Sequence, residues 1–330
     1  MNKHFTGIAE DPRNKLQKSL DWKHEDIFPT GLPYVWKEFK ESDIPQYTIR
    51  NQNGSGSCVA FSVCKALGIN NLKEKGKYVD LRPEFIYTKR TNDGSGMYPQ
   101  QAFSLACKHG APEDPTLKGD NLNDAQMNAY AATAEETEQA LKYRGKNYVM
   151  INKDDVDEIA KVIEQGHTPC FLVRCDISEW TPEPVVNLTK SYPFNINHEI
   201  PAIYAGMKGG VKTIVINDSW GSSYGRNGLR YLSEDFIKTR VVEVGYIVDL
   251  PDELIPPPFK FNKNLYLGMR NVDVLQLQKR LVKEGFAGFV PTGYFGYLSS
   301  VAIMKYQKSK GISPQFPICG PQTRNALNNS

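Results

Sequence analysis

The chain has 330 residues, a length at which one hydrophobic core is usually joined by a second domain. Its 40% hydrophobic and 23% charged residues are ordinary for a globular protein and exclude a fibrous or wholly disordered chain. The net charge of +3 arises without a basic run, and no apolar stretch reaches the ~20 residues of a membrane-spanning helix. We therefore expect neither nucleic acid nor a membrane as a partner.

Residues 1–30 are polar with scattered aromatic side chains, and we interpret them as an N-terminal extension of unknown role. They lack the apolar core and the small-residue cleavage site of a secretory signal peptide, so we expect synthesis in the cytoplasm. The six cysteines are too few for a dense disulfide framework and include no CxxC pair. Reduced thiols, no metal and no cofactor are therefore expected.

The hydrophobic pattern changes from helical to strand-like along residues 31–250. In the first part, apolar residues recur at helical spacing over 58–75, 82–90, 98–109 and 154–165. Later, short runs bounded by glycine or proline predict strands over 170–175, 200–205, 213–216, 228–232 and 241–248. Helices followed by strands in this way indicate an α+β domain.

Residues 251–264, PDELIPPPFKFNKN, separate this domain from the rest of the chain. Three consecutive prolines fix φ and remove backbone donors, which favours an extended connector. Residues 265–330 then contain the patterns V-x-x-L-Q-x-x-L-x-x-x-G-F, T-G-Y-F-G, A-I-x-x-Y-Q-x-x-x-G-I and G-x-x-T-x-x-x-L. Their spacing predicts a small helical bundle with these apolar residues in its core.

A candidate nucleophile, Cys58, lies where a glycine- and serine-rich loop meets the first helix, in the run QNGSGSCVAFS at 52–62. At a helix N-terminus the unpaired amides and the helix dipole stabilise a thiolate and lower the pKa of a cysteine. The alternative is a small buried hydrophobic residue at the start of a helix. The surrounding sequence has to decide between the two.

That sequence resembles the papain family of cysteine peptidases, in which a glutamine lies six residues before the nucleophile and A-F-S or A-F-A follows it. Gln52 and Cys58 have this spacing. The resemblance implies that the Gln52 side-chain amide and the Cys58 N–H form an oxyanion hole. It also implies a two-lobed fold, with a helical left lobe and a β-barrel-like right lobe. Val59 stands where the family usually has tryptophan, which changes a groove wall but removes no catalytic atom.

His198 is the preferred base, because NHEIPAIYAG resembles the family stretch in which the catalytic histidine leads into an apolar strand. Downstream, NDSWGSSYGRNGLRYL resembles the family block in which asparagine precedes S-W-G. Asp218 takes the place of that asparagine, where it would orient His198 and favour its charged form, and Trp220 would shield it. The other four histidines are expected to be surface or capping residues, and HEIP lacks the second histidine of a zinc site.

Two further positions are candidates for substrate contact through the same resemblance. Gly96 lies in DGSGMYPQQAFSLACKHGAP, which is similar to the family's glycine-containing substrate wall, so we expect it to contact the substrate backbone. The alternative for Gly96 is a flexible turn. Asn197, next to His198, is a candidate for lining a substrate subsite. Trp220 is also a candidate for substrate contact.

Residues 265–330 resemble the small three-helix peptidoglycan-binding domain throughout their length. Together the resemblances predict a cysteine endopeptidase with a Cys58–His198–Asp218 triad that cuts peptide or protein substrates and binds bacterial peptidoglycan through residues 265–330. Such a protein would act at the cell wall or in a virion, as phage lysins and virion-associated peptidases do. Two alternatives stay open: a catalytically silent wall-binding or structural protein with the papain fold, and a peptidase that matures particle proteins.

Overall fold

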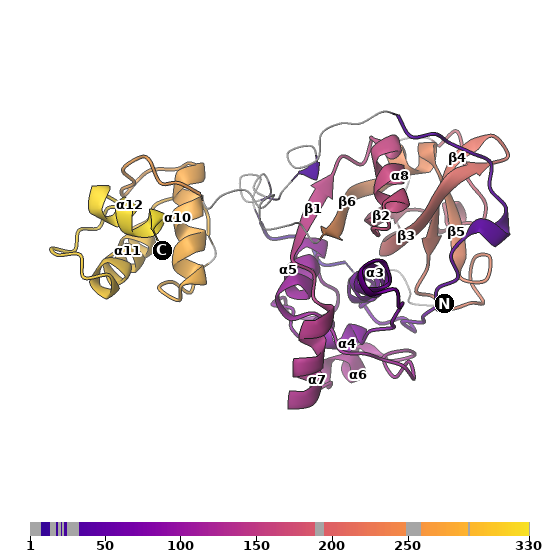
Figure 1. Cartoon of the computed structure of the whole chain (residues 1–330), viewed down its shortest axis with the longest axis horizontal. Coiled ribbons are helices and arrows are strands. Elements are labelled where there is room, and N and C mark those ends of the chain that lie inside the picture. The colour runs from indigo at the N-terminus through magenta and orange to yellow at the C-terminus, as the bar shows by residue number, and fades with distance from the viewer. Residues whose placement is uncertain are drawn as a thin grey trace. The chain divides into compact units, whose positions relative to one another are not determined.

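The chain forms two compact units in the computed structural model, which describes residues 8–13, 18, 21, 23–24, 33–188, 195–248, 259–289 and 291–329 (Figure 1). The first unit contains Met1–Asp11 and Trp22–Leu250, and the second contains Pro12–Asp21 and Pro251–Ser330. The break at Pro251 coincides with the first residue of the predicted connector. Residues 251–258 of that connector, and most of the extension 1–30, lie outside the described residues.

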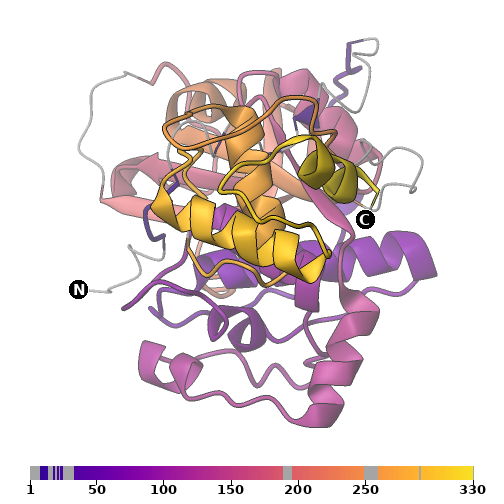
Figure 2. The ribbon, with the colours of Figure 1, turned by 90° about the vertical axis from the view of Figure 1, so that its left-hand side faces the viewer.

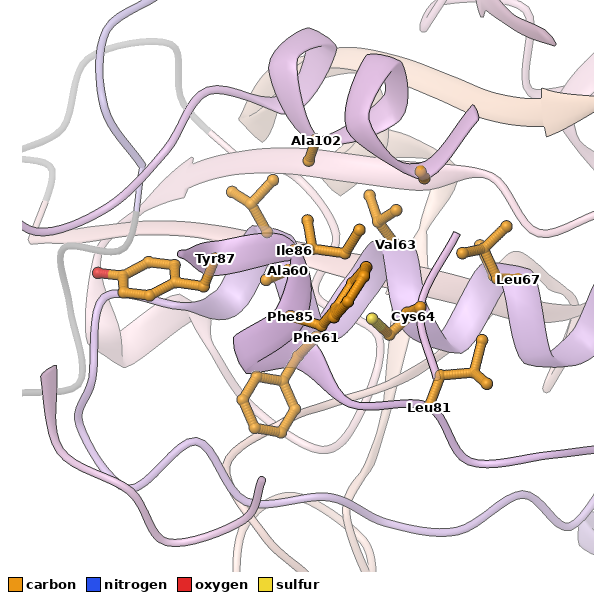
Figure 3. Packing of buried hydrophobic residues seen from close by; sticks show 14 of the residues in the cluster. Ala60, Phe61, Val63, Cys64, Leu67, Leu81, Phe85, Ile86, Tyr87 and Ala102 are labelled. Carbon is orange, nitrogen blue, oxygen red and sulfur yellow. The ribbon is translucent and has the colours of Figure 1, made fainter. Parts of the chain in front are cut away.

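Helix α3, Cys58–Lys75, belongs to the first unit and covers the residues for which the sequence predicts a helix. Every residue from Cys58 to Asn71 is buried, so the helix is enclosed on all sides. It ends where Gly76 takes a left-handed conformation with φ of 70° and donates its N–H to the Leu72 carbonyl. Figure 3 shows the apolar side chains of α3 packed among those of neighbouring segments, including Leu81, Ile86 and Ala102.

Shorter helices make up the rest of the helical part of this unit. Their bounds are α4 (Pro83–Tyr87), α5 (Pro99–His109), α6 (Asp124–Asn128) and α7 (Ala134–Ala140), with 3-10 turns η1 (Glu41–Asp43), η2 (Leu141–Tyr143) and η3 (Ile177–Glu179). Helices α4 and α5 begin with proline, whose missing N–H is not needed in a first turn, and they match predicted helices. Helices α6 and α7 were not predicted, although Asn123 with Gln126 and Thr133 with Glu136 form capping boxes at their starts.

The strands form one six-stranded antiparallel sheet in the order β1-β6-β2-β3-β4-β5. Their bounds are β1 (Asn147–Ile151), β2 (Cys170–Cys175), β3 (Ile196–Lys208), β4 (Val211–Asn217), β5 (Leu229–Ser233) and β6 (Val241–Val248). Helix α8 (Val156–Glu164) precedes β2, and α9 (Glu234–Arg240) precedes β6. Strands β2 and β6 have the predicted bounds, whereas β1 and α9 were missed. The expected α+β organisation is confirmed.

Strand β3 is longer at both ends than the predicted strand at 200–205. Its first residues include the polar Asn197, His198 and Glu199, which interrupt the apolar pattern from which the strand was predicted. They pair with Arg174, Val173 and Leu172 of β2. Helices α3 and α8 both pack against β3. The extension therefore fixes His198 on a rigid strand next to the buried helix α3.

Between residues 259 and 329 the second unit contains three helices, drawn orange to yellow in Figures 1 and 2. They are α10 (Val272–Lys283), α11 (Tyr297–Ser309) and α12 (Pro321–Asn328). The buried core includes the predicted Val274, Leu277, Leu281, Ala302, Ile303, Tyr306 and Leu327. Gln278 accepts hydrogen bonds from the backbone N–H groups of Thr292 and Gly293, both at 2.8 Å, and so holds the T-G-Y-F-G turn. None of the described helices is long and apolar enough to cross a membrane.

Candidate active site

Cys58 begins α3 directly after the loop at 52–57, and its side chain is fully buried. The loop turns back on itself, because Ser55 donates from its N–H and its hydroxyl to the Gln52 carbonyl at 3.0 and 2.7 Å. Burial raises the pKa of the Cys58 thiol to about 12, opposite to the lowering expected at a helix N-terminus. The backbone N–H groups of Glu199 and Val59 lower this pKa, but the loss of hydration has the larger effect. Burial therefore favours the neutral thiol at Cys58.

His198 and Asp218 form a buried pair on neighbouring strands, since His198 lies on β3 and Asp218 directly follows β4. Their Nε2 and Oδ1 atoms are 2.9 Å apart, and both side chains are 1% exposed. When Nε2 donates its proton to Asp218, Nδ1 is left as the nitrogen that can accept a proton. The pair has the geometry of a base whose ring is held by a carboxylate.

Cys58 lies beside the strand segment that carries this pair, because α3 packs against β3. The negative charges of Glu199 and Asp218 act on the thiol and raise its pKa beyond the effect of burial. The structure therefore brings the candidate nucleophile and the candidate base into one region from positions 140 residues apart in the chain.

Two tryptophans enclose the His198–Asp218 pair. The ring centroid of His198 is 4.9 Å from that of Trp220 and 5.9 Å from that of Trp180. Trp180 also donates from Nε1 to Asp218 Oδ2 at 3.2 Å. Trp220 is 2% exposed, so it covers the pair, and its contact with substrate stays a prediction. Trp180 was missed, because it lies in a stretch of sequence without a motif.

Arg230 is a further member of this cluster that sequence reasoning missed. Its Nε donates to Asp218 Oδ2 at 2.8 Å, and its Nη1 donates to the Trp180 carbonyl at 2.5 Å. Burial by itself raises the pKa of Asp218, but the hydrogen bond from His198 and the charges of His198 and Arg230 outweigh it, so the pKa lies below its usual value. The sequence contained one indication of this role. Arg230 lies inside the apolar run GLRYL, where an arginine would be buried, and a buried guanidinium requires a partner.

Gln52 is 1% exposed, and hydrogen bonds at both its amide oxygen and its amide nitrogen fix the orientation of the side chain. Ser219 donates from its hydroxyl to Oε1 at 2.6 Å, and Nε2 donates to the Ser55 carbonyl at 2.7 Å. The Gln52 backbone N–H also donates to the Ser219 carbonyl at 2.8 Å. Because a primary amide has two N–H groups, Nε2 keeps a second one for a ligand.

At Gly96 both backbone groups are hydrogen-bonded within the chain. Its N–H donates to the Tyr87 hydroxyl at 3.0 Å, and its carbonyl accepts from Asn92 Nδ2 at 2.8 Å. The next residue, Met97, instead presents its carbonyl to another segment and accepts from the Ala9 N–H at 3.1 Å. Substrate contact at Gly96 stays a prediction, and Met97 is a second candidate for backbone contact. A buried methionine gives no sequence signal for that role.

Asn197 faces the same segment from the opposite side. Its Nδ2 donates to the Ile8 carbonyl at 3.4 Å, and Ile8 forms an isolated parallel bridge with Met97. Two positions that are candidates for substrate contact, Asn197 and Met97, thus hold the extended segment Ile8–Ala9 of the chain's own N-terminal extension.

A second network joins the loop before Cys58 to the loop before α5. Asp124 accepts from the Gly56 N–H at 3.0 Å, from the Tyr87 hydroxyl at 2.8 Å and from the Ser95 hydroxyl at 3.0 Å. Glycine is required at position 56, because an added Cβ would lie 2.7 Å from the Gly96 backbone nitrogen and 2.0 Å from the Ser95 hydroxyl oxygen. Asp124 therefore ties the loop before Cys58 to the loop before α5, and sequence reasoning did not identify it.

The remaining histidines lie away from this cluster or outside the described residues. His24 is 4% exposed and bonds to the Tyr246 hydroxyl at 2.8 Å and to Glu158 Oε1 at 2.7 Å, so the surface or capping position expected for it is wrong. His109 ends α5, and His4 lies outside the described residues. Within the part of the chain that the structure describes, no group of three or more histidine, cysteine and acidic residues could hold a metal ion.

Comparison with models of known protein families shows which family the chain belongs to. The family model described as "Papain family cysteine protease" matches residues 36–243, which is more than half of the chain. A second model, described as "Putative peptidoglycan binding domain", matches residues 270–327. The chain therefore belongs to the papain family of cysteine proteases, as the sequence motifs predicted.

Individual relatives are distant. Cathepsin K of Gallus gallus is 26% identical over 196 residues, which are 58% of this chain and 56% of that protein. Cathepsin L 2 of Paramecium tetraurelia is 28% identical over 200 residues, 60% of this chain and 58% of that protein. The chain thus spans less than two thirds of the length of these relatives.

Solved structures agree with the fold. Xylellain, a cysteine protease from Xylella fastidiosa, has a TM-score of 0.60 at 15% identity, covering 76% of this chain and 98% of that one. The digestive procathepsin L2 proteinase of Tenebrio molitor has a TM-score of 0.57 at 15% identity, covering 75% of this chain and 79% of that one. At this identity the likeness concerns the fold alone, and it confirms the papain-like fold that the sequence predicted.

Proposed function

We propose that this chain is a cysteine endopeptidase in which Cys58 is the nucleophile, His198 the base and Asp218 the group that holds His198. The buried hydrogen bond of 2.9 Å between His198 and Asp218, on the strand against which α3 packs, is the observation that carries the proposal. In the first step the Cys58 sulfur bonds to the peptide carbonyl carbon while its proton passes to Nδ1 of His198. The amine then leaves with that proton, and water activated by His198 hydrolyses the thioester.

Gln52 would stabilise the oxyanion of both steps together with the Cys58 N–H. Its amide is held by Ser219 and Ser55, so its remaining N–H needs no reorganisation during the reaction. Such preorganised donors contribute about 10²–10³ in rate.

The raised pKa of Cys58 follows from the complete burial of the thiol before substrate binds. In the reaction the thiolate forms together with an imidazolium at His198, and the ionised Asp218 stabilises that imidazolium. The ion pair therefore depends on Asp218 and on access of substrate to Cys58.

Residues 265–330 would direct the enzyme to bacterial peptidoglycan, where it cuts wall cross-link peptides or nearby proteins. The match of residues 270–327 to the peptidoglycan-binding model supports this part of the proposal. The combination would suit a phage lysin or a virion-associated peptidase.

The test is parallel digestion of purified peptidoglycan and of casein by the full chain and by Cys58→Ala. We expect hydrolysis only by the unchanged chain, with both proteins sedimenting with peptidoglycan. Equal hydrolysis by Cys58→Ala would exclude the mechanism. Cleavage of casein without cleavage of peptidoglycan would favour the peptidase that matures particle proteins.

A catalytically silent wall-binding protein is the second candidate, and the complete burial and raised pKa of Cys58 favour it. A thiol-directed epoxide separates the two candidates at neutral pH. Labelling of Cys58, located by mass spectrometry, supports the peptidase. Sedimentation with peptidoglycan without labelling or hydrolysis supports the silent protein.

A further inference from the structure

We propose that this chain recognises a positively charged substrate side chain through Glu199 and Glu243, close to Cys58. This inference rests on the proposed peptidase function and names its substrate class: peptides in which a lysine, arginine or similar diamino side chain lies near the cut bond.

Glu199, Leu172 and Glu243 form one row across three strands. Leu172 of β2 pairs with Glu199 of β3 on one side and with Glu243 of β6 on the other. Residues directly opposite each other on antiparallel strands point to the same face of the sheet. The two carboxylates thus flank one leucine, and the charge of Glu243 acts on Glu199.

Glu199 is an unsatisfied group in this row. It is 1% exposed, and within the described part of the chain neither of its carboxylate oxygens has a hydrogen-bond partner. Burial, and secondarily the charge of Glu243, raise its pKa well above the usual value. A buried carboxylate without a partner is costly, so a native structure that keeps one needs a reason for it.

The row lies next to the place where a peptide backbone is held. Glu199 follows Asn197 by two residues on β3, so both side chains point to the same face, and Asn197 binds the Ile8 carbonyl. On the other side, Gln100 in the first turn of α5 donates to Glu243 Oε1 at 2.7 Å, three residues after Met97. An extended substrate held at the same two edges would direct a side chain toward the carboxylates.

The same row lies close to the candidate nucleophile. The Glu199 N–H lowers the pKa of the Cys58 thiol and its carboxylate raises it, so both groups are within electrostatic reach of the sulfur. A side chain bound at Glu199 would therefore belong to a residue near the scissile bond.

The negative charges of Glu199 and Glu243 favour binding of a positively charged substrate side chain. Arg174 pairs with Asn197 on the same face, but its Nε donates to Asn197 Oδ1 at 3.3 Å, and no ion pair joins it to Glu199 within the described ranges. An incoming ammonium or guanidinium group would give the unsatisfied Glu199 carboxylate charge-assisted hydrogen bonds. A neutral side chain of the same length would leave Glu199 unsatisfied, which is the condition for strong discrimination.

The test uses the full chain with peptide libraries that carry lysine or norleucine, its neutral counterpart, at each position around the cut. We expect lysine to raise kcat/KM by roughly 10–100-fold at one position. Glu199→Gln and Glu243→Gln should each reduce that preference while norleucine peptides are still cut, and the exposed Glu164→Gln should not. Because Glu243 is only partly buried, its variant serves as the test if Glu199→Gln does not fold. Peptide cleavage without a lysine preference, or a preference unchanged in both variants, would overturn the inference.

Calorimetry separates a failure of this inference from a failure of the proposed function. The Cys58→Ala chain is titrated with the lysine and norleucine forms of one peptide. At least about tenfold tighter binding of the lysine form supports the cationic site even if no peptide is cut and Cys58 resists the epoxide. Equal binding of the two forms contradicts the site even if the enzyme is active.

Discussion

Arg230 donates a hydrogen bond of 2.8 Å from Nε to Asp218, the residue that holds His198. The papain-family pattern has a neutral asparagine at this place, and an aspartate there would bury a negative charge beside the base. Arg230 supplies the compensating positive charge, and the depressed pKa of Asp218 is the consequence. The substitution of asparagine by aspartate is thus coupled to a second residue on β5.

Replacing Arg230 by methionine should destabilise the first unit. Asp218 would be left buried without its cation, and breaking a buried pair in this way typically costs roughly 3–5 kcal/mol. Urea unfolding followed by tryptophan fluorescence measures the loss, with Arg230→Lys as the milder control. Combining Arg230→Met with Asp218→Asn should recover part of the stability, because no unpaired charge remains. Strictly additive losses would contradict the coupling.

Ser219→Ala should slow hydrolysis without unfolding the protein. The Ser219 hydroxyl orients Gln52, and misplacing an oxyanion donor by about 1 Å reduces the rate up to roughly 10²-fold. We expect a lower kcat with little change in KM, and a larger loss for Gln52→Ala. The exposed Ser222→Ala is the matched control. If Gln52→Ala is slow while Ser219→Ala equals the unchanged chain, Ser219 has no positioning role.

Ala9→Pro should make Cys58 more accessible. The substitution removes the N–H that donates to the Met97 carbonyl, while Ala9→Ser keeps it. Loss of one hydrogen bond, about 1 kcal/mol, corresponds to a roughly fivefold shift toward release of the segment. The measurement is the rate of epoxide labelling of Cys58. Equal rates in Ala9→Pro and Ala9→Ser would show that this segment does not restrict access to Cys58.

Glu199→Gln should stabilise the protein at neutral and alkaline pH. The folded-state pKa of Glu199 is raised above its unfolded value of about 4.3, so the unchanged carboxyl group lowers stability as pH rises from that value through the folded pKa. Below about pH 4 the group is protonated in both states, and the advantage of glutamine should vanish. Thermal unfolding at pH values from 4 to 8 measures the difference. A difference independent of pH would mean that Glu199 is already ionised with a partner.

Several elements could be predicted because their signal is local. Helix α3 and strands β2 and β6 have the predicted bounds. Their apolar periodicity and the turn residues beside them are features of a continuous stretch of sequence, so they can be recognised without the tertiary structure. Helix α7 and strand β1 were missed because they carry few apolar residues or a weak alternation. For α7, the capping box at Thr133 was the readable signal.

The sequence by itself determined the family, the order of Gln52, Cys58, His198 and Asp218, and the helical nature of residues 265–330, because each follows from a short motif or from periodicity. Only the tertiary structure decided that Arg230 compensates Asp218, that the Met97 carbonyl accepts from the Ala9 N–H, and that burial raises the pKa of Cys58. These features depend on which distant segments exclude water from one another, and no local pattern of residues encodes that.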